Sequence, residues 1–221
     1  MLQERGSHVK IDNLPTDKHD FKSVELLAGL EESQVIPLIP KLLEWVQDIN
    51  WPIAAAVADL LQKYKVHTVS HIEAVFLLRN DSIWIYNILA YLMNEWDSRS
   101  VSALSSSILK LAQAPDVYED TDLLAVEMLW KHRLITKKAA AVLLETKLSD
   151  TEGMLNRFTA EQRNLYQTME NERLHILGTD PAQMMNHLLN YSDETFGQKR
   201  ELENLLRRQE EIAATINRIM E

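Results

Sequence analysis

Apolar residues recur along this chain at helical spacing, and the helical pattern itself repeats every 33 residues. Columns read at this spacing are apolar throughout: Val24, Val57, Ala90, Leu123; Leu27, Leu60, Met93, Val126; Leu43, Phe76, Leu109, Val142; and Leu42, Val75, Ile108, Ala141. No run of strand length alternates between apolar and polar residues. The pattern therefore predicts an all-α fold built from four helix pairs: 19–30 with 34–48, 52–64 with 67–78, 82–96 with 99–113, and 120–132 with 135–147.

Residues that favour helix ends stand between these segments. Four positions are predicted N-caps, because short polar side chains accept hydrogen bonds from the first free N–H groups of a helix: Asp17, Asn50, Asp81 and Ser98. Pro115 is predicted to end the helix before it. The joint at Asn50-Trp51-Pro52 ends one helix and starts the next, and we predict that Trp51 is buried there and is a centre of stability.

A different periodicity starts at Ser149, where Ser149 and Glu152 have the spacing of a capping box. One apolar run follows this point, and a second follows the turn Gly178-Thr-Asp-Pro181 with the spacing of a coiled-coil seam. Gly197 marks a weak point or kink in the second run. We therefore predict an N-terminal tail over 1–13, a helical repeat domain over 14–148, and an antiparallel helical hairpin over 149–221. The Leu202–Ile219 face should be buried, either on the first arm of the hairpin or in a homodimer.

Composition limits the classes of function. The 221 residues include no Cys, which excludes disulfides, thiol catalysis and Cys-ligated zinc. No run approaches the roughly 18 to 20 apolar residues of a membrane span, and the first residues lack a signal peptide's apolar stretch, so we expect a cytoplasmic protein. Lys and Arg number 23 against 33 Asp and Glu, a net charge of −10. This charge disfavours nucleic acid and favours a basic protein partner, although many proteins are acidic for solubility alone.

Few residues have the spacing of a catalytic or metal site. His67 and His71 lie four apart, as two metal ligands on a helix would, but the Glu of an H-E-x-x-H motif is missing and position 71 belongs to an otherwise apolar column. We interpret His71 as a partly buried structural histidine. No catalytic residue, metal ligand or cofactor site is assigned.

Two sets of residues are candidates for function. His19, Asp20, Glu44 and Asp48 could meet as an acid–base or metal site, or could instead cap and tie the turns. Trp84, Tyr86 and Tyr91 could fill the core or line a binding groove. As candidate binding residues we take Glu44, Asp48, Trp84, Tyr86 and Tyr91.

Residues 14–111 resemble an uncharacterised bacterial family of small helical-repeat domains of unknown function. The resemblance rests on Leu14-Pro-x-Asp-Lys-His-Asp-Phe21, on Leu42-Leu-Glu-Trp-Val-Gln-Asp-Ile-Asn-Trp-Pro52 continued by Ala56-Val-Ala-Asp-Leu-Leu61, and on Asn80-Asp-Ser-Ile-Trp84. It implies a HEAT-like stack of helix pairs and an association with bacterial toxin-neutralising proteins.

Two classes of function follow from these observations. The leading hypothesis is a non-enzymatic protein-binding module, an immunity protein that neutralises a basic toxin or effector domain by occlusion. The alternative is a metal-dependent hydrolase that uses His19, Asp20, Glu44 and Asp48. Binding to nucleic acid or to a membrane is not expected.

Overall fold

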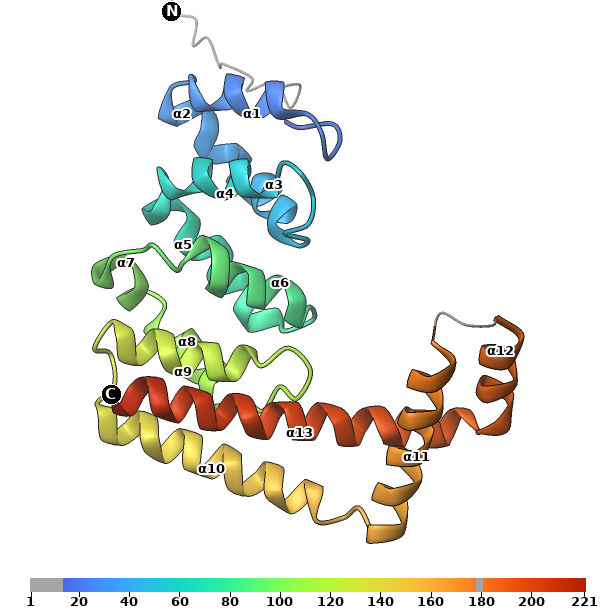
Figure 1. Ribbon diagram of the computed structural model, residues 1–221. Coiled ribbons are helices and arrows are strands. Elements are labelled where there is room, and N and C mark those ends of the chain that lie inside the picture. The colour runs from blue at the N-terminus through green and yellow to red at the C-terminus, as the bar shows by residue number, and fades with distance from the viewer. Residues whose placement is uncertain (1–13, 178–180) are drawn as a thin grey trace, which may run out of the picture. The chain divides into compact units, whose positions relative to one another are not determined.

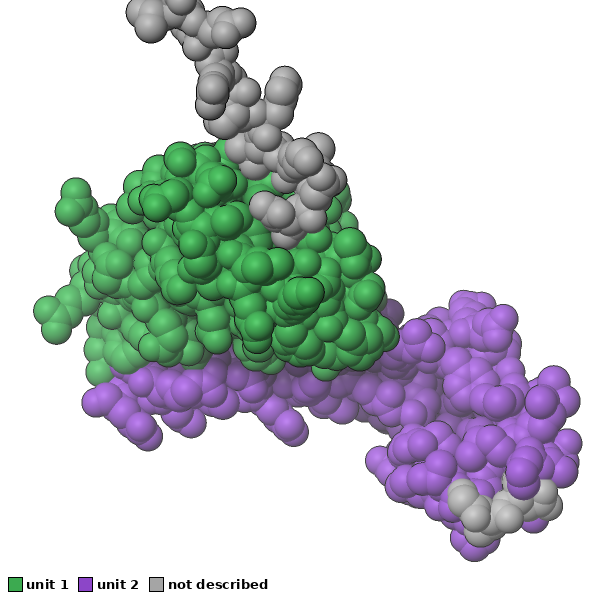
Figure 2. Space-filling model, turned by 90° about the horizontal axis from the view of Figure 1, so that it is seen from above, with its two compact units in different colours: residues 1–140 green, residues 141–221 purple. Residues whose placement is uncertain are grey.

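The computed structural model describes residues 14–177 and 181–221, and every regular element in these ranges is helical (Figure 1). The chain divides into two compact units, residues 1–140 and residues 141–221, which are coloured separately in Figure 2. In the described parts no strand occurs, and no helix is long and apolar enough to cross a membrane. The all-α prediction is confirmed.

Unit 1 is a stack of short helices in two rows. Its elements are α1 Phe21–Ala28, α2 Glu32–Val35, η2 Ile36–Leu38, α3 Ile39–Leu43, η3 Glu44–Val46, α4 Ala54–Gln62, α5 Lys65–Leu78, α6 Ser82–Asn87, the π-helix η4 Ile88–Leu92, α7 Ser98–Ser102, α8 Ser105–Gln113 and α9 Thr121–Lys131. One row consists of α1, α4, α6 with η4, and α9, each in contact with the next, and the other consists of α3, α5 and α8. Each row therefore stacks the corresponding helices of successive pairs.

Hydrogen bonds between neighbouring pairs follow the same periodicity. The amide of Gln62 donates to the carbonyl of Leu92, 30 residues on, and the hydroxyl of Ser107 donates to Glu73, 34 residues back, over 3.1 Å. The ammonium of Lys131 donates to the carbonyl of Asn94, 37 residues back, over 2.9 Å. Polar contacts as well as apolar ones thus recur near the 33-residue spacing of the sequence.

The predicted apolar columns are buried at most positions of the first three pairs, among them Leu27, Leu60 and Met93. The column through Leu43 fails in the fourth pair, because Val142 is 52% exposed, whereas Leu123 and Val126 of that pair are buried. Ala140 and Leu144 are the buried positions near Val142, and a residue two places after Ala140 lies almost on the opposite side of a helix. His71 is half-buried, as predicted.

Aspartates cap three of the helices of unit 1. Asp81 caps α6 as predicted, accepting from the backbone N–H of Trp84 at 2.9 Å. The caps of α1 and α7 are Asp20 and Asp97, which corrects the expectations of Asp17 and Ser98. In both cases the aspartate lies one place before the first helical residue, where its carboxylate reaches a free N–H group.

The joint before α4 differs from the prediction. Ile53, not Asn50, occupies the N-cap position, and Asn50 instead donates to the carboxylate of Asp48. The ring of Trp51 packs edge-on against Trp45, with centroids 5.4 Å apart, but Trp51 is only half-buried. The buried tryptophan of this unit is Trp96, at 3% exposure. The prediction that Trp51 is a core residue is therefore wrong, because its side chain lines a pocket at this joint.

Unit 2 consists of long helices: α10 Lys137–Leu155, which begins in unit 1, α11 Ala160–Ile176, α12 Pro181–Asn190 and α13 Asp193–Met220. Helices α10 and α13 run side by side, and α11 contacts α12 (Figure 1). Ser149 lies inside α10, so the capping box predicted there is wrong. The capping box of this region is formed by Thr159 and Gln162 at the start of α11.

The second apolar run predicted from the sequence, with the coiled-coil seam, is divided between two helices. Ser192 caps α13, so α12 and α13 are separate helices, and the predicted turn at 178–180 lies outside the described residues. Leu202, Leu205, Ile212 and Ile219 are each at most 6% exposed in the single chain. The Leu202–Ile219 face is therefore buried without a second copy. Helix α13 continues through Gly197.

Candidate functional site

A pocket lies at the joint between α3 and α4. Its lining consists of Leu14, Pro15, Lys41, Glu44, Trp45, Gln47 and Trp51. The carboxylate of Glu44 pairs with Lys41 at 2.8 Å, and both side chains remain about half exposed or more, at 47% and 64%. The predicted binding residue Glu44 thus borders an apolar pocket, whereas Asp48 does not line it.

The three carboxylates of the acid–base alternative, Asp20, Glu44 and Asp48, each interact with a residue close by in the sequence. Asp20 accepts hydrogen bonds from the hydroxyl and backbone N–H of Ser23, at 2.7 and 3.1 Å, and these bonds hold the pKa of Asp20 below its usual value. The backbone N–H of His19 donates to Asp17, and Asp48 accepts from Asn50. A carboxylate held ionised as a helix cap is a weak general base. Among the described residues, no group of three His, Asp or Glu is arranged to hold a metal ion.

The aromatic candidates lie on α6 and η4. Tyr86 and Tyr91 are brought together, with ring centroids 6.4 Å apart at 65°, and Tyr91 is 48% exposed. Trp84 is half-buried. The buried amide of Asn87 donates to the carbonyl of Gln47 at 2.9 Å, which holds α6 against the joint that carries Glu44. These aromatics thus share the region of the α3–α4 joint, but they are neither wholly core nor wholly surface.

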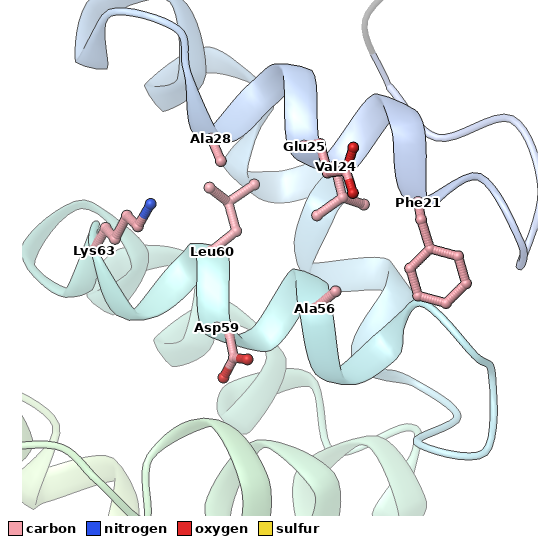
Figure 3. A pocket seen from close by; sticks show the side chains of 8 residues that line it. All are labelled: Phe21, Val24, Glu25, Ala28, Ala56, Asp59, Leu60 and Lys63. Carbon is pink, nitrogen blue, oxygen red and sulfur yellow. The ribbon is translucent and has the colours of Figure 1, made fainter.

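A second hollow lies between α1 and α4 and is shown in Figure 3. Val24 and Leu60 form its floor and are 5% and 3% exposed. Ala28 and Ala56 line it with small side chains, and Phe21 stands at one end with 43% of its surface exposed. Its charged lining residues are Glu25, Asp59 and Lys63. We call this the α1–α4 groove.

Acidic residues are concentrated in the part of unit 1 that carries both hollows. Residues 14–63, which include the lining of both hollows, hold eight Asp or Glu against four Lys or Arg, a net charge of −4, whereas residues 64–140 hold nine against eight, a net charge of −1. Glu25 and Asp59 are exposed, and neither makes a hydrogen bond or ion pair through its side chain within the part of the chain that the structure describes. Their charge is therefore available to a partner.

None of the binding residues predicted from the sequence lines the α1–α4 groove. The 33-residue spacing contains a sign of it, because Ala28, Ala56 and Asp59 stand where the next unit has large apolar residues. Such an interruption of an apolar column in a repeat protein identifies a place where the interface between units is not filled.

The fold and its hollows define an all-helical, stacked domain with an acidic N-terminal end. Residues 13–129 match a family described as a domain of unknown function (DUF5071), and the chain belongs to this family. The match covers α1 to nearly the end of α9 and includes both hollows. No curated protein matches the sequence.

Proposed function

We propose that this protein is a non-enzymatic binding module that recognises a basic protein through the N-terminal end of unit 1. The observation that supports it best is the net charge of −4 over residues 14–63, which carry two hollows with largely apolar lining. Acidic residues around a binding site attract a basic partner during association. Apolar hollows accept the buried side chains that supply most of the binding energy.

The stacked helix pairs suit this function. In a HEAT-like arrangement, which we propose for unit 1, corresponding helices of successive pairs form a continuous surface, and such surfaces bind extended faces of other proteins. The half-exposed Trp45–Trp51 pair and Tyr91 add aromatic side chains of the type that dominates binding energy in protein interfaces.

A basic toxin domain is the partner that we propose in particular. An enzyme that acts on nucleic acid presents a positively charged active site, so an acidic protein can neutralise it by covering that site. The protein would then act as a cytoplasmic immunity protein, and the gene beside its own would encode the toxin.

The experiment measures binding between the purified chain and the product of the adjacent gene by calorimetry, at low and high salt. We expect a complex whose affinity falls as salt rises. The double charge reversal Glu25→Lys with Asp59→Lys should weaken it by at least about tenfold, equivalent to about 1.4 kcal/mol. Glu145→Lys with Glu152→Lys is the control, since it changes the net charge equally at exposed positions of α10.

Two results would contradict the proposal. The first is equal weakening by both pairs of reversals, because binding would then depend only on net charge. The second is the absence of any complex together with metal-dependent hydrolysis that Glu44→Gln abolishes, which would instead support the hydrolase alternative.

A further inference from the structure

The α1–α4 groove is a gap in the packing between two neighbouring units. Val24 points from α1 toward α4, Leu60 points from α4 toward α1, and Phe21 and Lys63 stand at the two ends of the groove (Figure 3). Its volume is about 290 Å³. This lies at the lower end of the range for small-molecule pockets, so the groove suits an anchoring side chain better than a whole ligand.

The next interface along the same row has no such gap in its sequence pattern. The residues 33 positions after Ala28, Ala56, Asp59 and Lys63 are Leu61, Leu89, Leu92 and Trp96. All four are buried, with exposures between 0% and 3%. Where α1 meets α4, two alanines and two charged residues replace these large apolar side chains. The groove is therefore explained by specific residue choices and not by loose packing of the whole unit.

We infer that the α1–α4 groove binds a basic amphipathic helix of the partner protein, with one large apolar side chain of that helix on the Val24–Leu60 floor. This inference rests on the proposed function and specifies its binding site. Helices that bind in grooves use apolar anchors at one face and polar residues beside them. Lys or Arg next to the anchor would meet Glu25 on α1 and Asp59 on α4, both of which lack a partner in the described residues.

The test uses the full chain and a designed helical peptide of Leu and Lys, labelled with a fluorophore, with a Leu and Glu peptide of the same pattern as its counterpart. Fluorescence anisotropy at low salt measures binding. The double variant Ala28→Leu with Ala56→Leu keeps every charge and introduces the residue type found one unit later. We expect it to weaken binding of the basic peptide by at least about tenfold.

The neighbouring substitution Ala55→Leu is the matched control, because Ala55 is exposed on α4 and does not line the groove. It should leave the affinity unchanged, and the Leu and Glu peptide should not bind. Circular dichroism confirms that each variant is folded. If the double variant does not fold, amide chemical shifts of the wild-type protein replace it, and the basic peptide should perturb α1 and α4 before other helices.

The outcomes separate this inference from the proposed function. If the peptide still binds the groove-filling variant but not the variant with Glu25 and Asp59 reversed, the inference that the groove holds the helix is wrong. Recognition of a basic partner by these two acidic residues would still be supported. Amide chemical-shift changes centred outside α1 and α4, or no binding of the basic peptide, would also contradict the inference that the groove binds the helix. The proposed function itself is decided by the complex with the adjacent gene product.

Discussion

Two glycines in the interiors of long helices provide a sharp test of the structure of unit 2. Gly153 lies in α10 and Gly197 in α13, and both are exposed. A Cβ atom added at either position would meet no heavy atom within 4 Å. Gly153→Ala and Gly197→Ala should therefore add helix stability without creating or removing any tertiary contact.

The magnitude follows from the backbone alone. Alanine is favoured over glycine in a helix interior by roughly 0.5–1 kcal/mol, because glycine loses more conformational freedom on folding. The two sites lie on different helices, so the double variant should gain about 1–2 kcal/mol. For a chain of this size each kcal/mol raises the melting temperature by about 2–4 °C.

Urea denaturation followed by far-UV circular dichroism measures the gain. All five tryptophans lie between Trp45 and Trp130, in unit 1, so tryptophan fluorescence reports that unit separately. Gly29→Ala is the control: Gly29 is the C-cap of α1, outside the helix interior, and its added Cβ would meet only the carbonyl of Leu26 at 3.6 Å. Its effect should stay within about 0.5 kcal/mol.

A loss of stability in Gly197→Ala would refute this reasoning. It would mean that α13 is bent, or is in close contact, at the position where the structure has a continuous and open helix. An effect equal to that of Gly29→Ala would equally count against a helix interior at Gly153 and Gly197.

Three further predictions concern burial and charge. Trp96→Ala should cost about 3–5 kcal/mol and half-buried Trp51→Ala clearly less, measured by urea denaturation, and the reverse order would contradict the burial described here. Burial lowers the pKa of His132, so the free energy of unfolding should be highest above a pH of about 6.5 and fall as the pH drops below it. His132→Gln should remove this part of the pH dependence, and an unchanged pH dependence would contradict the role of His132. Hydrogen bonds from Arg173 and then Lys199 lower the pKa of Glu170 from 4.5 to about 2, so its contribution is present above pH 4.5 and is lost toward pH 2. Acid titrations of Glu170→Gln should be flatter in that window, and a curve parallel to wild type would refute the ion pairs.

Much of unit 1 could be predicted from the sequence, because its helices follow local rules. Asp81 precedes α6 with the side chain that a helix start requires, and Pro115 follows the end of α8. The column through Leu27 is apolar because the same helix face is buried in each unit, at Leu27, Leu60, Met93 and Val126. Spacing alone carries this information.

The candidate site was predicted only in part. Of the predicted binding residues, Glu44 lines a pocket and Tyr86 contacts Tyr91. Glu25 and Asp59 could not be chosen in advance among the many exposed acids of the chain. Their role depends on small residues of two different helices lying opposite each other, which is a property of the packed pair and not of either helix.

The sequence by itself determined the helical class and the acidic balance of the first units, since these depend on local spacing and on composition. Only the tertiary structure decided that α10 runs through Ser149, that Trp51 is only half-buried and that Val142 is exposed. In each case the local pattern was compatible with two outcomes. The choice between them depended on which distant side chains cover a given face, because burial is a sum over neighbours that are remote in the chain.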